Sequence, residues 1–372
     1  MKVVITTDSF LPRWDGVARF LSLLIPVLKK EAKVVVFAPK FEGKMPELGV
    51  NVIRFPLVKI KFGDIYFSSP DKNKMAEHIK TADVVFNQTI GPIGLAGVRL
   101  AKKYNKPVVS FIHSIEWELA KGAVKRGKWF VKRGVRFIAK RFYNKCSLLI
   151  CPSKQVADML SANGIRARKE VIKLGVQTNV FVPTKSKSSA KVKVGILPSR
   201  LVVGYVGRLA REKDLGTLYK AFVKVKRKFP KSVLLFVGGG SLDDVPKSSD
   251  VILTGAQNNV VKYLQAMDVF VLPSLTETSS LATMEAMSCA VPVVATPVGS
   301  VPEYVRDGKT GFIFSRHDVS ELEKILTMLL GKTKLRKSVG SAGRGLIQKN
   351  FSWDVAANRL VELLRLEADN IR

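Results

Sequence analysis

Two glutamates separated by seven residues, Glu277 and Glu285, frame a short polar stretch in the C-terminal half of the chain. An apolar run before them, 269–272, predicts a buried strand, and a helix is predicted to begin near Ser280. Ligands of open α/β sheets bind outside the carboxyl ends of strands. A helix N-terminus also offers unpaired N–H groups and the positive end of the helix dipole. The pattern therefore predicts a phosphate site framed by two carboxylates.

Two basic residues, Arg208 and Lys213, follow another predicted strand, 201–206, which is flanked by glycine. In so basic a chain these charges could be solvated surface residues, but their position just after a strand favours a functional role. The sequence has no Asp-x-Asp pair, so it offers no obvious carboxylate clamp for a divalent metal ion. The glycine run 238–240 lacks the full dinucleotide-binding pattern and is weak evidence for a nicotinamide cofactor. We therefore predict neither a metal site nor a cofactor.

The elements that must position these residues alternate between short apolar strands and longer helices. Such alternation is typical of α/β proteins, whose parallel sheets are covered by helices on both faces. Strands are expected at 3–6, 34–38, 52–55, 84–86, 108–112 and 148–151, and again at 201–206, 233–237, 251–253, 269–272 and 293–295, with helices at 17–29, 94–104 and 353–366 among others.

A polar, small-residue stretch at 185–191 interrupts this alternation and predicts a linker or exposed loop at a domain boundary. The alternation then restarts. At 372 residues the chain is long enough for two α/β domains. We predict an N-terminal acceptor- and membrane-binding domain at 1–183, a nucleotide-sugar-binding domain at 184–350, and a final segment, 351–372, that crosses back to the first domain.

The motifs together resemble glycosyltransferase family 4, which comprises retaining enzymes of the GT-B fold. The resemblance rests on the glutamate pair with Ala286-Met287, and it extends over nearly the whole chain. The other matching residues are Thr7–Pro12 and Asp15–Ala18, Gly204–Leu209 with Lys213-Asp214, Pro292–Ala295, Gly299, Pro302-Glu303, Val305, Gly308 and Gly311-Phe312. The resemblance implies two Rossmann-like domains whose parallel sheets face each other across a cleft.

The resemblance also implies roles for individual residues. Arg208 and Lys213 would neutralise the donor diphosphate, Glu277 would accept hydrogen bonds from the transferred sugar, and Glu285 from the ribose. His113 would lie near the transferred sugar, although a lone histidine is more often structural. Gly16 would let the backbone approach the diphosphate, or could simply serve a turn with Asp15. The predicted catalytic set is His113, Arg208, Lys213 and Glu277, and the donor-binding set is Gly16, Arg208, Lys213, Glu277, Ser279, Ser280, Leu281 and Glu285.

The sequence departs from the family pattern after the first glutamate. A glycine pair around a bulky residue is common there, whereas this chain has Thr278-Ser279-Ser280. Backbone N–H donation to phosphate survives the change, but the loop shape and the choice of sugar are affected. Ala290 and Ser300 also replace common glycines.

The formal net charge is +32, which favours phosphate-rich partners such as anionic lipid, nucleic acid or phosphorylated small molecules. The basic residues concentrate at 121–145, which contains no acidic residue. On a helix, Val131, Val135, Ile138 and Phe142 would share one face, which could pack into the domain core. Basic amphipathic helices with aromatic residues bind membrane surfaces. The predicted membrane-binding residues are Lys125, Arg126, Lys128, Trp129, Lys132, Arg133, Arg136, Lys140 and Arg141.

The residues Ile60-Lys61-Phe62 and Ile65-Tyr66-Phe67 form a second basic and aromatic stretch, which we place in the acceptor-binding region. The sequence contains no spanning segment of about 18 apolar residues and no secretory signal, and its odd number of cysteines suits a reducing cytosol.

The resulting hypothesis is a metal-independent, retaining hexosyltransferase. It would use a UDP- or GDP-sugar and a lipid or lipid-linked acceptor, and would sit peripherally on the inner face of the cell membrane. A transferase with a soluble acceptor, a nucleotide-sugar epimerase and, more distantly, a nucleic-acid-binding protein are the alternatives. No nucleic-acid motif supports the last.

Overall fold

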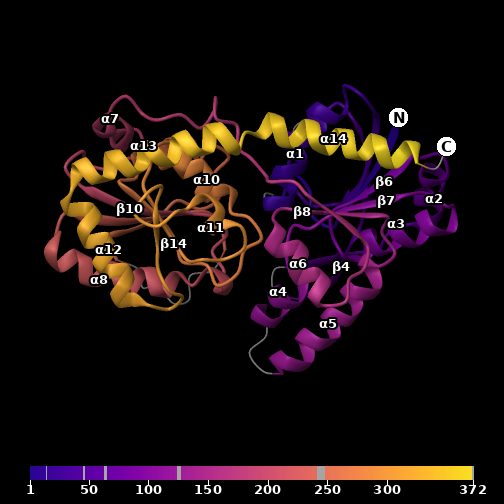
Figure 1. The fold of residues 1–372 in the computed structure, drawn as a ribbon, viewed down its shortest axis with the longest axis horizontal. Coiled ribbons are helices and arrows are strands. Elements are labelled where there is room, and N and C mark those ends of the chain that lie inside the picture. The colour runs from indigo at the N-terminus through magenta and orange to yellow at the C-terminus, as the bar shows by residue number, and fades with distance from the viewer. Residues whose placement is uncertain (14, 45–46, 63–64, 124–126, 241–247, 371–372) are drawn as a thin grey trace. The chain divides into compact units, whose positions relative to one another are not determined.

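The computed structural model describes residues 1–13, 15–44, 47–62, 65–123, 127–240 and 248–370. The chain divides into two compact units, which we describe separately (Figure 1). Unit 1 comprises Met1–Lys173 together with Ala356–Arg372, and unit 2 comprises Leu174–Val355. Each unit contains one large parallel sheet, as the alternation of apolar strands and helices predicts.

The sheet of unit 1 is built around β1, which pairs in parallel with β2 and β6. The central strands are apolar and buried on both faces, which is why they appear as continuous runs of Val, Ile and Phe. The strand order is β3-β2-β1-β6-β7-β8-β9. The strands are β1 (Lys2–Thr6), β2 (Lys33–Pro39), β3 (Asn51–Phe55), β6 (Val84–Asn87), β7 (Val108–Phe111), β8 (Leu148–Cys151) and β9 (Arg168–Val171).

Helices lie on both sides of this sheet (Figure 1). They are α1 (Gly16–Leu28), α2 (Lys72–Lys80), α3 (Pro92–Lys103), α4 (Glu116–Ala123), α5 (Lys128–Tyr143) and α6 (Lys154–Ala162). An antiparallel hairpin, β4 (Leu57–Phe62) and β5 (Ile65–Ser68), was not predicted as strands. Strand β9 was also missed, because its charged sequence RKEV is that of an edge strand rather than a core strand.

Unit 2 repeats the same design with the strand order β12-β11-β10-β13-β14-β15. Its strands are β10 (Leu201–Val206), β11 (Ser232–Val237), β12 (Val251–Leu253), β13 (Val269–Leu272), β14 (Val293–Ala295) and β15 (Phe312–Ile313). Its helices are α7 (Lys187–Val192), α8 (Leu215–Lys228), α9 (Val261–Ala266), α10 (Leu281–Ser288), α11 (Val301–Tyr304), α12 (Val319–Gly331) and α13 (Thr333–Asn350), and a 3-10 turn, η1, spans Arg211–Lys213.

The stretch 185–191, predicted as a linker or exposed loop, instead contains helix α7. The reason is a buried ion pair, because Lys191 Nζ lies 2.7 Å from Asp268 Oδ2 and both side chains are almost fully buried. Asp268 Oδ2 also accepts a hydrogen bond of 2.8 Å from Val202 N. Two charges removed from water must be paired and hydrogen-bonded, so this contact docks α7 onto the strands of unit 2.

The unit boundary falls after Lys173, ten residues before the predicted one at 183. The intervening segment belongs to unit 2 through hydrogen bonds that are distant in sequence. Val176 N donates to Phe351 O at 2.9 Å, and Ser288 Oγ donates to Phe181 O at 2.7 Å. Composition alone does not reveal these partners. The prediction therefore placed the boundary next to the polar stretch at 185–191.

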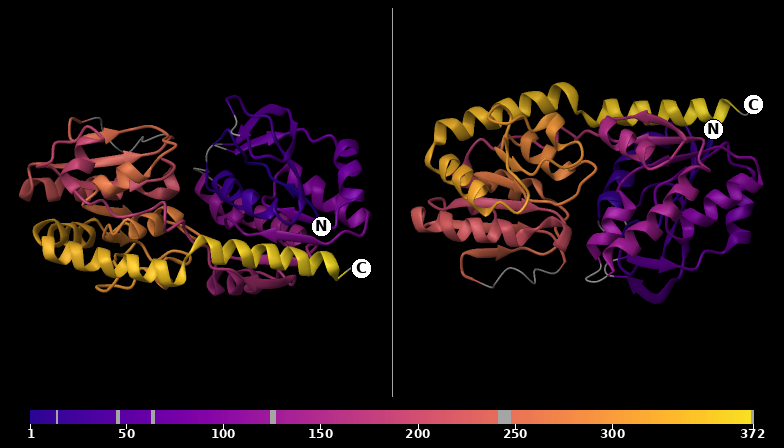
Figure 2. Two further views of the ribbon diagram at one scale, coloured as in Figure 1. Left: turned by 90° about the horizontal axis from the view of Figure 1, so that it is seen from above. Right: turned by 60° about the horizontal axis from the view of Figure 1, so that its bottom comes forward.

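The C-terminal helix α14 (Trp353–Asp369) begins in unit 2, and its residues from Ala356 onward belong to unit 1. In unit 1 its side chains form ion pairs between Glu367 and Arg168 and between Arg365 and Glu31. Leu360 and Leu364 of the same helix are fully buried. Figure 2 shows α14 as the yellow helix that ends beside the N-terminus.

Helices α4 and α5 are joined by a buried carboxyl group. Tyr143 donates a hydrogen bond of 2.6 Å to Glu116 Oε1. The other oxygen, Oε2, is buried without a hydrogen-bond partner among the residues that the structure describes. Burial raises the pKa of Glu116 from 4.5 to about 7. The native protein therefore binds this proton more tightly than the unfolded chain does.

We expect Glu116→Gln to stabilise the fold above pH 7. The stabilising contribution of the protonated Glu116 is complete below pH 4.5 and is lost as the pH rises through about 7. At about 1.4 kcal/mol per pKa unit, the variant should gain about 1–3 kcal/mol over the wild type at pH 8 and little at pH 5. Urea unfolding at the two pH values measures the difference. A gain independent of pH, or an equal gain from changing the exposed Glu77 to Gln, would contradict this assignment.

Candidate active site

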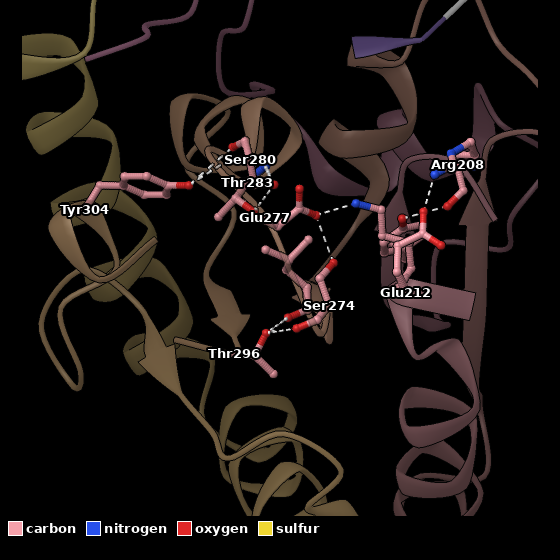
Figure 3. A network of polar contacts seen from close by, with 11 residues as sticks. Arg208, Glu212, Ser274, Glu277, Ser280, Thr283, Thr296 and Tyr304 are labelled. Atoms are coloured by element: carbon pink, nitrogen blue, oxygen red, sulfur yellow. Dashed lines mark hydrogen bonds and ion pairs between the residues drawn. The ribbon is translucent and has the colours of Figure 1, made fainter. Parts of the chain in front are cut away.

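The predicted catalytic residues of unit 2 lie in the loops that follow β10 and β13. These strands are parallel neighbours, so their carboxyl ends share one edge of the sheet. Lys213 comes from the first loop and Glu277 from the second. Their side chains meet there, with Lys213 Nζ 2.5 Å from Glu277 Oε1 (Figure 3). The structure therefore brings together two site residues that are 64 positions apart in the sequence.

Glu277 is held in place by a second hydrogen bond from its own loop. Ser274 Oγ donates to Glu277 Oε1 at 2.9 Å, and Thr296 Oγ1 donates to the backbone oxygen of Ser274 at 2.5 Å. The Glu277 side chain is still 15% exposed. A carboxylate accepts several hydrogen bonds at once, so this arrangement fixes its orientation while it can still accept from a ligand hydroxyl. Ser274 had no predicted role, although it stands three residues before Glu277 in the motif.

Arg208 lies beside Glu212, with which it forms an ion pair (Figure 3). Tyr205 donates to the backbone oxygen of Arg208 at 3.0 Å, and Leu275 N donates to the backbone oxygen of Glu212 at 2.8 Å. The second contact ties the loop after β10 to the loop after β13. Glu212 was not predicted, but its position four residues after Arg208 and next to Lys213 is a signal that could have found it.

Helix α10 begins at Leu281, and Ser280 is its N-cap residue, where the sequence predicts the helix to begin. Ser280 Oγ accepts from Thr283 N at 3.4 Å, and Ser280 N donates to the hydroxyl of Tyr304 at 3.2 Å (Figure 3). Glu285 lies on this helix with 2% of its surface exposed. Ser279, Ser280 and Leu281 therefore precede or open a helix whose positive dipole end faces the loop of Glu277.

Gly299 is required by the close approach of its loop to Glu277. It has a φ of +54°, and a Cβ atom there would lie 2.3 Å from the backbone oxygen of Glu277. The next residue, Ser300, donates its N–H to the backbone oxygen of Thr278 at 3.0 Å. The loop after β14 thus supports the Glu277 loop from behind, and no side chain larger than hydrogen fits between them.

His113 belongs to unit 1, in the loop after β7. Its Nε2 lies 2.8 Å from Gln88 Oε1, and its ring packs on Phe20 and Phe111 with centroid distances of 4.9 and 4.6 Å. Burial lowers the pKa of His113 to about 3, so the ring is neutral at physiological pH. Gln88 was not predicted, although it lies two residues after the predicted strand 84–86 and directly follows β6.

Gly16 is the first residue of helix α1 in unit 1. Asp15 is the N-cap, and its carboxylate accepts from Val17 N and Ala18 N at 3.0 Å each. A Cβ atom at Gly16 would meet no described atom within 4 Å. Packing among the described residues therefore does not require glycine here, and the predicted approach to a ligand stays a prediction.

Helix α5 carries the predicted membrane-binding residues. Its buried side consists of Ala139, Phe142 and Tyr143, with Val135 packed against the core. The expectation that Ile138 shares this side is wrong, because Ile138 is 51% exposed. At about 100° per residue, Ile138 lies closer to Phe130 and Gly134 than to the centre of the buried side.

The outer side of α5 is apolar as well as basic. Phe130 and Phe137 are 74% and 60% exposed, and Trp129 and Ile138 are also exposed. Arg133 lies over the Trp129 ring at 5.5 Å, and Arg141 over the Phe137 ring at 5.6 Å. Of the other predicted residues, Lys140 is exposed, Lys132 pairs with Glu118 and Arg136 bonds to Asn163, whereas Lys125, Arg126 and the side chain of Lys128 lie outside the described residues.

Among the residues that the structure describes, no helix combines the length and the apolar character needed to cross a membrane. Within the same ranges, no group of three or more His, Cys, Asp or Glu side chains is arranged to hold a metal ion.

Two family models match the chain. Residues 14–180 match the model described as Glycosyltransferase Family 4, and residues 200–332 match the one described as Glycosyl transferases group 1. The first lies in unit 1 apart from its last seven residues, and the second lies within unit 2.

The curated relatives include enzymes that are named for lipids. The chain is 27% identical to a GDP-mannose-dependent α-(1-6)-phosphatidylinositol monomannoside mannosyltransferase of Mycolicibacterium smegmatis, over 97% of this chain and 98% of the relative. It is 25% identical to an α-monoglucosyldiacylglycerol synthase of Streptococcus pneumoniae, over 86% of this chain and 77% of the relative.

Among solved structures, Anabaena HepE in complex with UDP-glucose matches with a TM-score of 0.79 and 20% identity, over 98% of this chain and 99% of that one. At this identity the likeness concerns the fold. It confirms the predicted α/β architecture, GT-B, with two Rossmann-like domains.

We expect Gly299→Ala to impair the site more than the fold. The substitution adds a Cβ atom where the Glu277 backbone oxygen lies, so the Glu277 loop must move. Displacing a catalytic group by about 1 Å can cost about 100-fold in rate. Steady-state transferase kinetics and thermal unfolding, measured on the same samples, separate the two effects.

Gly308→Ala is the matched control. Gly308 has a similar φ of +67°, but a Cβ atom there meets nothing within 4 Å. Both variants therefore carry the same backbone strain of about 1–2 kcal/mol, and only Gly299→Ala carries the collision. Equal activity in the two variants would show that the loop contact does not position Glu277.

Proposed function

Because the chain belongs to glycosyltransferase family 4, we propose that it transfers a hexose from a UDP- or GDP-sugar to a hydroxyl group of a lipid or lipid-linked acceptor, with retention of anomeric configuration. The observation that carries this proposal is the cluster of Arg208, Lys213 and Glu277 at the carboxyl edge of the unit 2 sheet. It combines cations for a diphosphate with a carboxylate for sugar hydroxyls.

The basic residues of the cluster would act on the leaving group. Arg208 and Lys213 are held by the carboxylates of Glu212 and Glu277, which keep both cations at the strand ends. When the bond from the sugar to the diphosphate breaks, negative charge develops on the phosphate oxygen. Fixed cations that stabilise such developing charge often make the largest contribution to catalysis.

The carboxylates would orient the sugar and the nucleoside. Glu277, fixed by Ser274 and Lys213, would accept hydrogen bonds from the transferred sugar. Glu285 would accept from the ribose, and the N-terminus of α10 would face phosphate oxygens. His113, neutral because burial lowers its pKa, would act as a hydrogen-bonding group rather than as a cation.

The reaction balances without another reactant. The bond between the anomeric carbon and the diphosphate oxygen breaks, and a bond from that carbon to the acceptor oxygen forms on the same face. The acceptor proton passes to the departing phosphate oxygen. In this proposal Arg208 and Lys213 supply the positive charge at the diphosphate, and no metal ion is required.

A lipid acceptor at the inner face of the cell membrane is supported by two independent observations. Curated relatives that match nearly the full chain include one named for a phosphatidylinositol mannoside. Helix α5 exposes aromatic side chains together with Arg133, Lys140 and Arg141. Each basic residue near an anionic surface contributes about 1 kcal/mol to binding.

The activity test is release of nucleoside diphosphate from a panel of UDP- and GDP-sugars, with vesicles of polar lipid extract and with EDTA present. We expect lipid-dependent release with one donor, unaffected by EDTA. Lys213→Met should lower it by about 100-fold or more, because it removes a fixed charge at the leaving group. Lys220→Met, at an exposed position on α8, is the matched control.

The other outcomes decide between the alternatives. Release that needs a soluble sugar instead of lipid would replace the lipid acceptor. Conversion of the nucleotide sugar without any acceptor would indicate an epimerase, and loss of activity with EDTA would overturn metal independence.

We expect the exposed aromatic residues of α5 to contribute to membrane binding beyond charge. Replacing Phe130 and Phe137 together by Ser should weaken binding to anionic vesicles by about ten-fold or more, because burying a Phe side chain contributes about 1.5–3 kcal/mol. Vesicle co-sedimentation at two salt concentrations measures the effect. The exposed Leu197→Ser in unit 2 is the control. If the double variant bound the vesicles as well as the wild type, electrostatic attraction alone would account for membrane binding.

A further inference from the structure

Arg13 lies in a cluster with two aromatic rings in unit 1. Its guanidinium carbon lies 4.9 Å from the ring centroid of Tyr66 and 5.6 Å from that of Phe41. The two rings contact each other at 5.6 Å in an edge-to-face arrangement. The three residues come from separate segments: the loop after β1, the loop after β2, and strand β5 of the hairpin. We call them the Arg13 cluster.

Asp15 fixes the cluster to the start of helix α1. Arg13 Nε lies 3.8 Å from Asp15 Oδ2, and Asp15 Oδ1 caps α1 through Val17 N and Ala18 N. Ser9 also bonds to the Asp15 carboxylate. The guanidinium is thus positioned by a carboxylate that is itself immobilised, and its side chain remains 22% exposed.

The position of the cluster within unit 1 is that of a ligand site. β1 and β2 are parallel, and the loops carrying Arg13 and Phe41 both follow their carboxyl ends. The loop of His113 leaves the same edge after β7, two strands from β1 in the sheet order. At about 4.8 Å per strand, the ends of β1 and β7, from which these two loops leave, are about 10 Å apart along the edge.

The chemistry of the cluster fits a phosphate group. The faces of the Tyr66 and Phe41 rings attract the positive charge of the guanidinium, whereas phosphate is recognised by guanidinium N–H groups, so the two kinds of contact are chemically compatible. Because the contacts with the two rings already restrict the Arg13 side chain, it loses less conformational freedom when a ligand binds. The half-buried rings of Tyr66 and Phe41 beside it suit the apolar face of a cyclic headgroup.

We propose that the Arg13 cluster binds a phosphate group in the headgroup of the acceptor, so that the enzyme prefers an anionic phospholipid-type acceptor to a neutral glycolipid. This inference rests on the proposed glycosyl transfer and adds the acceptor class to it. It separates an anionic from a neutral class of lipid, and both classes occur in the names of the relatives, as a phosphatidylinositol mannoside and a monoglucosyldiacylglycerol. In the mechanism Arg13 is a positioning residue, because it binds the acceptor away from the reacting hydroxyl.

The kinetic test compares acceptors in vesicles of identical surface charge, one set containing phosphatidylinositol and the other monoglucosyldiacylglycerol. We expect the wild type to prefer phosphatidylinositol. Arg13→Gln should raise the KM for phosphatidylinositol by about ten-fold or more and leave the KM for the nucleotide sugar unchanged. Arg13→Lys, which keeps the charge but lacks the planar fork, should recover only part of the loss. Arg99→Gln, at an exposed position on α3, is the control and should change neither value.

A binding test that needs no turnover keeps this inference separate from the proposed activity. Calorimetric titration of the full chain with glycerophosphoinositol, and separately with UDP and GDP, compares the wild type with Arg13→Gln. Weaker glycerophosphoinositol binding with unchanged nucleotide binding supports the proposal, even if no lipid in the kinetic panel is glycosylated.

Three results would overturn it. Weaker UDP or GDP binding in Arg13→Gln would assign the cluster to the donor diphosphate instead. Equal behaviour of Arg13→Gln and the wild type would make the cluster a structural contact between loop and hairpin. Failure of the wild type to bind glycerophosphoinositol, or glycosylation of the neutral glycolipid in preference to phosphatidylinositol, would exclude phosphate recognition.

Discussion

The parallel pairing of β10 with β13 is the constraint on which the candidate active site depends. Because the two strands run in the same direction, their loops leave one edge of the sheet together, and Lys213 meets Glu277 there. A cation and a carboxylate that are partly removed from water stabilise each other's charged form. Their attraction offsets part of the cost of removing both charges from water, and it keeps both side chains oriented before any ligand arrives.

Several surrounding contacts serve this pair. Ser274 donates to the carboxylate of Glu277, and Gly299 lets the next loop support the backbone of Glu277 from behind. The hydrogen bond from Leu275 N to the backbone oxygen of Glu212 joins the two loops independently of the ion pair. Arg208 is oriented by its own carboxylate, Glu212. The site is thus a preorganised set of charges, which is the property that electrostatic catalysis requires.

Unit 1 divides its chemistry between two surfaces with different physical characters. The carboxyl edge of its sheet carries a neutral, half-buried histidine and an arginine in contact with two aromatic rings, both suited to specific recognition. The outer side of α5 combines exposed aromatic rings with basic residues, a composition suited to a fluid, anionic surface. The position of the positive charges is therefore as informative as their number. Basic residues that lie beside aromatic rings or at strand ends are the ones that suit binding.

Local patterns in the sequence determined the elements and the family. Buried strands such as 3–6 and 269–272 are continuous apolar runs, and the hydroxyl of Ser280 marks the start of α10. The motifs around Glu277 and Glu285 were sufficient to indicate the glycosyltransferase family, and the family models confirm it. The individual roles of these residues stay predictions.

Only the tertiary structure decided which residues act together. The partnerships of Glu212, Ser274 and Gln88 require loops from different strands to be neighbours, which follows from strand order rather than from spacing. The composition of 185–191 is that of a linker, but the ion pair between Lys191 and Asp268 makes the stretch part of unit 2. Helical periodicity places Ile138 with the core residues, but the structure leaves its side chain exposed. Periodicity and turn chemistry are local properties of a chain, whereas burial and charge pairing depend on partners that are distant in sequence. For that reason the sequence could indicate the family of this protein and its candidate residues, and the fold was needed to show which of those residues are neighbours.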